Sequence, residues 1–319
     1  MAYSHTSLRN ARSGNVKWTL RVALDREIYH AGDILQANVF LCVVEPVHCN
    51  GIMGYIRGEE KVTWSEKTAR RAAGEEVYSR QNEFLNDKMI VAKPRMYGPG
   101  EYVFPVVYQL HSTLPLSFQL KCPPATALNG VHAQLGYVFH VCLNANHGVM
   151  VEAQQEVVIE EARVPTRPLI GLEAAMPALT TPPAVPSEDR LLATLDKAAY
   201  RPGDTLRVRC RVLNCSTYRC DGRESFTVLL RLFQDVIVAV APLKQGESSR
   251  LLCERSFQVA TNATAFELPL ELVSGPNGAA PVERSFYSSF VDCRHRLAVE
   301  GFMPNSSGVV KTEVAVAIL

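Results

Sequence analysis

Apolar and polar residues alternate with a period of two through much of the chain. Residues 16–24, 131–143, 149–159, 291–299 and 309–319 each place their apolar side chains mainly on one side. This is the pattern of a half-buried β-strand. The charged stretch from Arg57 to Lys88 is predicted to form two strands and a long hairpin loop, and the one helical candidate is a short segment near residues 67–77. The sequence therefore predicts an all-β protein built from antiparallel β-sandwiches of immunoglobulin-like type.

One segment occurs twice. Residues 24–35 read LDREIYHAGDIL, and residues 195–206 read LDKAAYRPGDTL. The shared frame, Leu-Asp followed by Tyr-x-x-Gly-Asp-x-Leu, recurs at an offset of 171 residues. An internal repeat of this kind indicates two copies of one structural unit.

The strands that follow the two segments are in phase. Leu35, Ala37, Val39 and Leu41 share one face of the first strand, and Leu206, Val208, Cys210 and Val212 share one face of the second, again 171 residues later. A slip of one residue would turn either face to solvent. The phase therefore supports two related β-sandwiches in tandem.

The Gly-Asp pairs are predicted to be structural turns. Glycine adopts backbone angles that other residues resist, and aspartate accepts hydrogen bonds from nearby backbone amides. This role is predicted for Gly32, Asp33, Gly203 and Asp204.

Proline divides the chain. The span 163–188 contains six prolines, which rule out a central strand and predict a linker. The predicted organisation is a disordered N-terminus at residues 1–15, a first domain at 16–162, the proline-rich linker at 163–188 and a second domain at 189–319.

Composition narrows the functional classes. The chain has 319 residues, with 33 Lys and Arg against 32 Asp and Glu, so its net charge of +1 gives no global attraction to nucleic acid. The beginning of the sequence has no apolar signal-peptide core, and the longest apolar stretch, near Val236–Leu243, is too short to span a membrane. An odd number of cysteines, nine, argues against a disulfide framework. We therefore expect a cytoplasmic protein without a transmembrane segment.

No pattern of catalytic chemistry stands out. The sequence lacks phosphate-loop, dinucleotide-binding, zinc-protease and serine-hydrolase motifs. The nearest metal pattern, Cys210-x4-Cys215-x4-Cys220, lacks the closely spaced pairs that zinc prefers, and Cys210 is on the predicted core face. We predict no catalytic residue, no metal site and no cofactor.

One surface feature suggests binding. Arg207, Arg209 and Arg211 alternate with core residues, so all three should point outward from one strand, with Arg201, Arg219 and Arg223 nearby in sequence. Guanidinium groups bind phosphate and carboxylate bidentately. These three arginines are the candidate anion- or partner-binding site, with a phosphorylated tail or a phosphoinositide headgroup as ligand. The alternative is a solvated strand face balanced by acidic neighbours.

The order of several short motifs resembles the arrestin-like family. Tyr29–Asp33 before an alternating strand is similar to the early strand of arrestin-fold N-domains, and Tyr200–Asp204 is similar to the start of the C-domain. Gly100–Leu110 (GEYVFPVVYQL) followed by Leu114–Phe118 (LPLSF) is similar to a segment of alpha-arrestins, the arrestin-domain-containing proteins. Among branches of the arrestin fold, the sequence resembles alpha-arrestins first and the retromer subunits second.

The resemblance implies a non-enzymatic adaptor or scaffold. Its partners would be cytoplasmic tails of membrane proteins or trafficking proteins, in endocytosis or endosomal sorting, with peripheral attachment to endosomal or plasma membranes. Alpha-arrestins usually recruit ubiquitin ligases through PPxY motifs, and this chain contains none. The alternatives are a core subunit of a retromer-like coat, a structural two-sandwich protein, and an enzyme with no recognisable motif.

Overall fold

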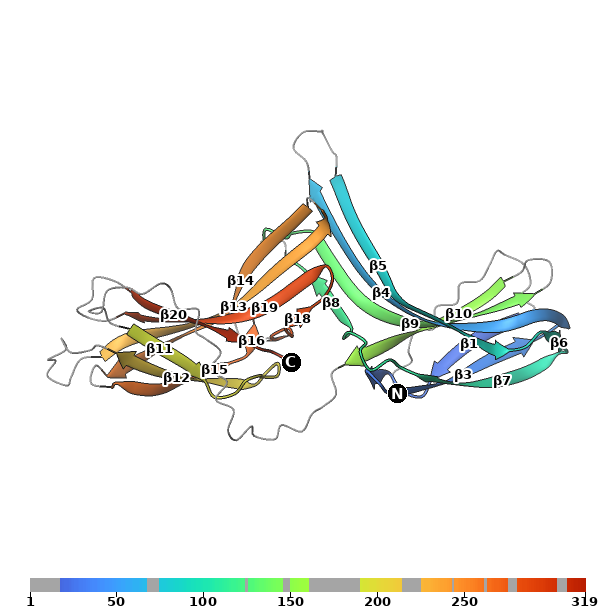
Figure 1. Ribbon diagram of the computed structural model, residues 1–319, viewed down its shortest axis with the longest axis horizontal. Helices are drawn as coiled ribbons and strands as arrows, with labels where there is room; N and C mark the ends of the chain where they lie inside the picture. The colour runs from blue at the N-terminus through green and yellow to red at the C-terminus, as the bar shows by residue number, and fades with distance from the viewer. Residues whose placement is uncertain are drawn as a thin grey trace. The chain divides into compact units, whose positions relative to one another are not determined.

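The computed structural model describes most of the chain in two compact units (Figure 1). The N unit comprises Met1–Pro123 and Asn129–Pro165, and the C unit comprises Pro124–Leu128 and Thr166–Leu319. The residues described are 18–67, 75–123, 126–145, 150–160, 190–213, 225–242, 244–260, 263–274, 280–302 and 309–319. The predicted disordered N-terminus and the proline-rich linker lie outside these residues.

The N unit contains a smaller and a larger sheet. The smaller sheet has the order β1-β3-β7, formed by Trp18–Leu24, Ile34–Val43 and Gly100–Gln109. The larger sheet has the order β2-β10-β9-β4-β5, formed by Ile28–His30, Met150–Glu160, Val131–Ala145, Val47–Lys67 and Glu75–Ala92. Two short strands extend it, with β6 (Arg95–Tyr97) on β4 and β8 (Phe118–Lys121) on β9.

The C unit repeats this plan. Its smaller sheet has the order β11-β12-β15, formed by Arg190–Leu195, Thr205–Leu213 and Ala265–Glu271. Its larger sheet has the order β14-β13-β19-β18, formed by Lys244–Ala260, Ser225–Ala241, Val291–Phe302 and Phe286–Tyr287. The strand β20 (Val309–Val316) pairs with β19, and β16 (Val273–Ser274) pairs with β17 (Ala280–Pro281).

The predicted fold class is confirmed. The described elements are all strands, and nearly all of their pairings are antiparallel. The helical candidate near residues 67–77 is wrong at both described ends, because Lys67 ends β4 and Glu75 begins β5. No helix in the described part of the chain is long and apolar enough to span a membrane.

Apolar residues recur at every second position of the strands, so they gather on one face of each sheet. Each core forms where two such faces pack together. In β12 the buried residues are Leu206, Val208, Cys210 and Val212, and the residues between them are exposed. In β3 the corresponding positions Leu35, Ala37, Val39 and Leu41 are buried in the same way. Burying an aliphatic side chain contributes about 1.5–3 kcal/mol, so this phase fixes which face of each sheet turns inward.

The repeated segment forms the same corner in both units. The Tyr29 hydroxyl donates a hydrogen bond to Asp25 Oδ1 at 2.6 Å, and the Tyr200 hydroxyl donates to Asp196 Oδ1 at 2.6 Å. The same carboxylate oxygens also accept a backbone N–H, from Gln36 at 3.2 Å and from Arg207 at 3.0 Å. Burial opposes ionisation of Asp25, but the bonds from Tyr29 and Gln36 outweigh it and lower its pKa.

The Gly-Asp turns match as closely. Gly32 has a φ of +87° and Gly203 a φ of +86°, a region that disfavours side chains with a Cβ. The following aspartates accept the backbone N–H of the residue three positions earlier, in the bonds His30 N to Asp33 Oδ2 at 3.0 Å and Arg201 N to Asp204 Oδ2 at 3.1 Å. These contacts are internal to each corner, so the turn residues act as local structure.

Candidate anion-binding face of the C unit

The arginines of β12 lie in a row on the outer face of the smaller sheet. Arg207, Arg209 and Arg211 are all exposed, because the residues between them point into the core. Alternate residues of a strand are about 6.8 Å apart, so the backbone positions of the three arginines repeat at this interval along one line.

Few acidic residues neighbour this row. Across the β12–β15 register, Arg207 is opposite Pro269, Arg209 is opposite Glu267 and Arg211 is opposite Ala265. On the other side, β11 places Thr194 opposite Arg209 and Leu192 opposite Arg211. Two carboxylates therefore adjoin the row: Glu267 lies opposite Arg209, and Asp196, the residue after β11, accepts the backbone N–H of Arg207.

Glu267 is shared between two arginines. Arg207 Nη1 lies 3.1 Å from Glu267 Oε1, and Arg209 Nε lies 3.3 Å from Glu267 Oε2. Among the described residues, no ion pair involves Arg211. Each guanidinium carries five N–H donors, so most of the row's donors remain for a ligand, and the local charge is positive.

The outer face of the larger sheet shows the opposite arrangement. There each of three cations contacts two carboxylates, with N···O distances between 2.6 and 4.0 Å. The contacts form the continuous series Glu254–Arg231–Glu300–Lys311–Glu313–Arg296–Asp235. Such a network satisfies its own charges, so arginine content alone does not mark an anion site.

The neighbouring arginines of the sequence prediction are placed only in part. Arg201 is exposed at the corner before β12, and its backbone N–H donates a hydrogen bond to Asp204 Oδ2. Arg219 and Arg223 lie outside the described residues. The structure thus brings together Arg207, Arg209 and Arg211, and the turn residues Gly203 and Asp204 lie just before them in the chain.

Cysteine and histidine chemistry is not assembled in the described residues. Burial raises the pKa of the Cys210 thiol to about 12, so it is a core residue, while Cys215 and Cys220 lie outside the described chain. The parts of the chain that are placed hold no group of three or more His, Cys, Asp or Glu suited to a metal ion.

Sequence reasoning missed a buried polar pair in the C unit. Gln234 and His295 are 4% and 2% exposed and face each other across β13 and β19. The signal was present, because His295 occupies a position on an otherwise apolar strand face.

These features define a class of protein made of two related β-sandwich units. Residues 10–163 match the family model of the arrestin (or S-antigen) N-terminal domain. The N-terminal region of the chain therefore belongs to the arrestin-like family. The matched region lies almost entirely within the N unit and does not distinguish the alpha-arrestin branch from the retromer-subunit branch.

Proposed function

We propose that this chain is a non-enzymatic cytosolic adaptor that binds the cytoplasmic tails of membrane-protein cargo. Arrestin-like proteins are in general adaptors that bind cargo or trafficking proteins, which supports the role. The observation that carries it is the row Arg207, Arg209 and Arg211, three exposed cations of which two pair with the same carboxylate, Glu267.

The row favours an extended anionic peptide as ligand. Its arginines repeat at about 6.8 Å, the spacing of alternate side chains in an extended chain. A tail with phosphorylated or acidic residues at alternate positions could contact each guanidinium in turn. A phosphoinositide headgroup presents a compact cluster of phosphates instead, so it would engage part of the row.

One edge beside the row is closed to strand addition. Along a strand, consecutive residues direct their backbone nitrogens alternately to the two sides. The Leu272 N–H donates toward β12 at 2.9 Å, so the nitrogen of Pro269, three residues earlier, faces the free edge of β15. In the N unit Leu110 donates toward β3 at 2.9 Å, which places Pro105 in the same way on β7. Proline has no N–H to offer a partner strand. A peptide bound here would therefore lie across the sheet face or beside β11.

Removal of the row tests the proposal. The variant Arg207→Ala/Arg209→Ala/Arg211→Ala should reduce affinity for a phosphorylated tail peptide at least tenfold, as measured by fluorescence anisotropy at fixed ionic strength. A matched control, Arg57→Ala/Arg255→Ala/Arg294→Ala, removes three exposed cations from other surfaces and should bind like the parent. Equal binding by both variants would contradict the proposal. Loss of binding to phosphoinositide vesicles but not to peptides would identify a membrane site instead.

The alternative function is a subunit of a retromer-like coat. It is favoured by the match to a domain that both branches of the family share. Size-exclusion chromatography of the endogenous protein separates the two roles, because a coat subunit should elute in a large complex of defined size and an adaptor should not. No PPxY motif is present, so recruitment of a ubiquitin ligase would need a different contact.

A further inference from the structure

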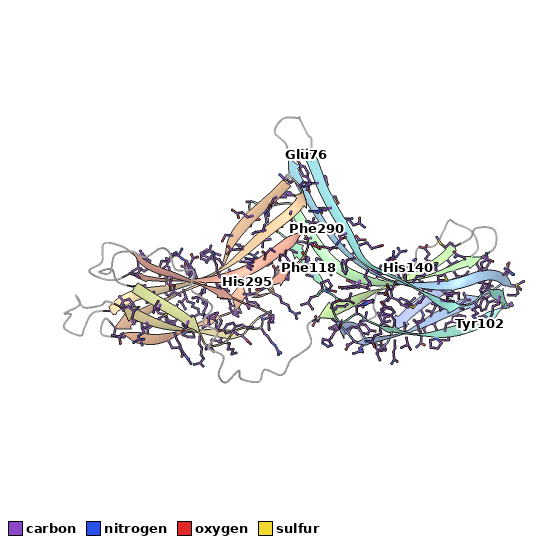
Figure 2. The ribbon with its side chains drawn as sticks, viewed as in Figure 1. Glu76, Tyr102, Phe118, His140, Phe290 and His295 are labelled. Atoms are coloured by element: carbon purple, nitrogen blue, oxygen red, sulfur yellow. The ribbon has the colours of Figure 1, made fainter. Side chains whose placement is uncertain are left out.

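The core of the C unit contains a row of polar side chains on the inward face of its larger sheet. Gln234 on β13 is opposite His295 on β19 and opposite Arg250 on β14, so the three side chains share one face of the larger sheet. Gln234 and His295 are almost fully buried, and Figure 2 shows His295 within the C unit.

Strand pairing identifies the matching place in the N unit. In the N unit Phe118 of β8 pairs with Leu135 of β9, and in the C unit Phe286 of β18 pairs with Cys293 of β19. Two residues further along β9 and β19 lie Tyr137 and His295, which therefore occupy corresponding positions. Tyr137 is opposite Gly58, where an added Cβ would lie 2.8 Å from the tyrosine ring. The N unit therefore fills this place with an aromatic ring, and the C unit fills it with polar side chains.

Each of these two positions lies beside a serine that makes the same pair of hydrogen bonds in both units. In the N unit, Ser117 N–H donates to Ile159 O at 2.8 Å, and Ile159 N–H donates to Ser117 Oγ at 3.0 Å. In the C unit, Ser285 and Ile318 make the same two bonds at 2.7 and 3.2 Å. These bonds fasten the segment that ends each larger sheet.

In the C unit this contact is connected to a titratable group. Ser285 Oγ lies 2.9 Å from His295 Nδ1, and because the oxygen accepts the Ile318 N–H, its own proton is available to the imidazole. His295 Nε2 is buried without a hydrogen-bond partner among the described residues. Protonation would turn Nδ1 from the acceptor of the serine proton into a donor that competes for the oxygen holding the Ile318 N–H, and it would bury a charge in the core.

The surrounding charges do not favour the imidazolium. Burial lowers the pKa of His295 to about 4; Arg250 acts in the same direction and Asp235 opposes it. The carboxylates in the vicinity are engaged elsewhere, with Glu283 bonded to Gln234, Asp235 to Arg296 and Glu313 to Arg296. The other cations of this region are Arg284 before Ser285, and Arg294 and Arg296 on β19 itself. Val316, opposite His295 on β20, contributes no charge.

We propose that His295, Ser285 and Ile318 form a proton-sensitive latch that fastens the end of the C unit's larger sheet. With neutral His295 the serine holds Ile318, and protonation releases it. The N unit has the same fastening without the proton-sensitive member, so acid should loosen the C unit first.

The two fastenings allow a test inside one molecule. Amide hydrogen exchange of the full chain, followed by NMR from pH 7 to pH 4.5 and corrected for intrinsic rates, compares the Ile318 and Ile159 amides. A shift of the His295 pKa from 6.5 to about 4 predicts about 60-fold loss of protection at Ile318 between pH 7 and pH 4.5. Ile159 should change less than threefold. Parallel loss at both amides would overturn the proposal.

Two variants assign the effect to His295. His295→Asn keeps a polar atom near the position of Nδ1 but does not titrate, so the acid response at Ile318 should disappear; a retained response would refute the latch. Arg250→Gln removes a cation that disfavours protonation, so release should begin at higher pH. An unchanged or lower release pH in Arg250→Gln would also refute it, and this half-buried position decides the matter if His295→Asn does not fold.

Discussion

The outer faces of the two smaller sheets occupy equivalent places and differ in chemistry. In the C unit the central strand presents Arg207, Arg209 and Arg211, whereas the N unit presents Gln36, Asn38 and Phe40 at the positions 171 residues earlier. Arg21 lies over the Phe40 ring at 4.2 Å, and Val103 and Val107 are exposed on the neighbouring β7. The exposed faces have diverged while the corners beside them kept the same hydrogen bonds.

This contrast separates what the fold needs from what it leaves free. The tyrosine hydroxyl, the aspartate and the backbone N–H at each corner are bonded to one another, so changing one leaves a buried group unsatisfied. The identity of an outward-facing side chain of β3 or β12 is not restricted in this way. The outer faces can therefore differ between the two units without loss of the fold.

The largest expected effect comes from breaking the shared corner. Asp25→Ala and Asp196→Ala each remove an acceptor of two hydrogen bonds, one of them from a nearly fully buried tyrosine. Each should lower the free energy of unfolding of its own unit by about 2–3 kcal/mol. Urea unfolding, followed by exchange of amides specific to each unit, measures the two losses. A unit that tolerated the change would show that the corners are alike only in geometry.

A smaller effect is expected where the two cores differ. Gly58→Ala would place a Cβ 2.7 Å from Phe84 and 2.8 Å from Tyr137, and overpacking of this kind costs about 1–3 kcal/mol. The matched change, Gln234→Ala in the C unit, creates no clash, and it frees Glu283 from its bond. Thermal unfolding monitored separately in each unit should show the larger loss in the N unit. The reverse order would mean that the polar row stabilises the C unit more than aromatic packing stabilises the N unit.

The sequence was enough for the all-β class, for the phase of the core strands and for the outward direction of the three arginines. All of these depend on period-two alternation and on a local repeat. The sequence did not reveal that Glu267 neutralises part of the row, because this contact joins strands 58 residues apart. Likewise, the His295–Ser285–Ile318 contact depends on strand pairing and a connecting segment, and neither can be read from local pattern.

The smallest effect on stability, and the sharpest on binding, is expected at Glu267. Glu267→Gln removes the carboxylate that Arg207 and Arg209 share, and because all three side chains are substantially exposed, folding should change by less than about 0.5 kcal/mol. The freed guanidinium groups should raise affinity for a phosphorylated peptide about two- to fivefold and steepen its dependence on salt. The matched control is Glu254→Gln, which leaves Arg231 paired with Glu300 on the larger sheet and should not change binding. Equal gains in both variants would show that the peptide responds to overall charge; a gain confined to Glu267→Gln would locate the ligand on β12.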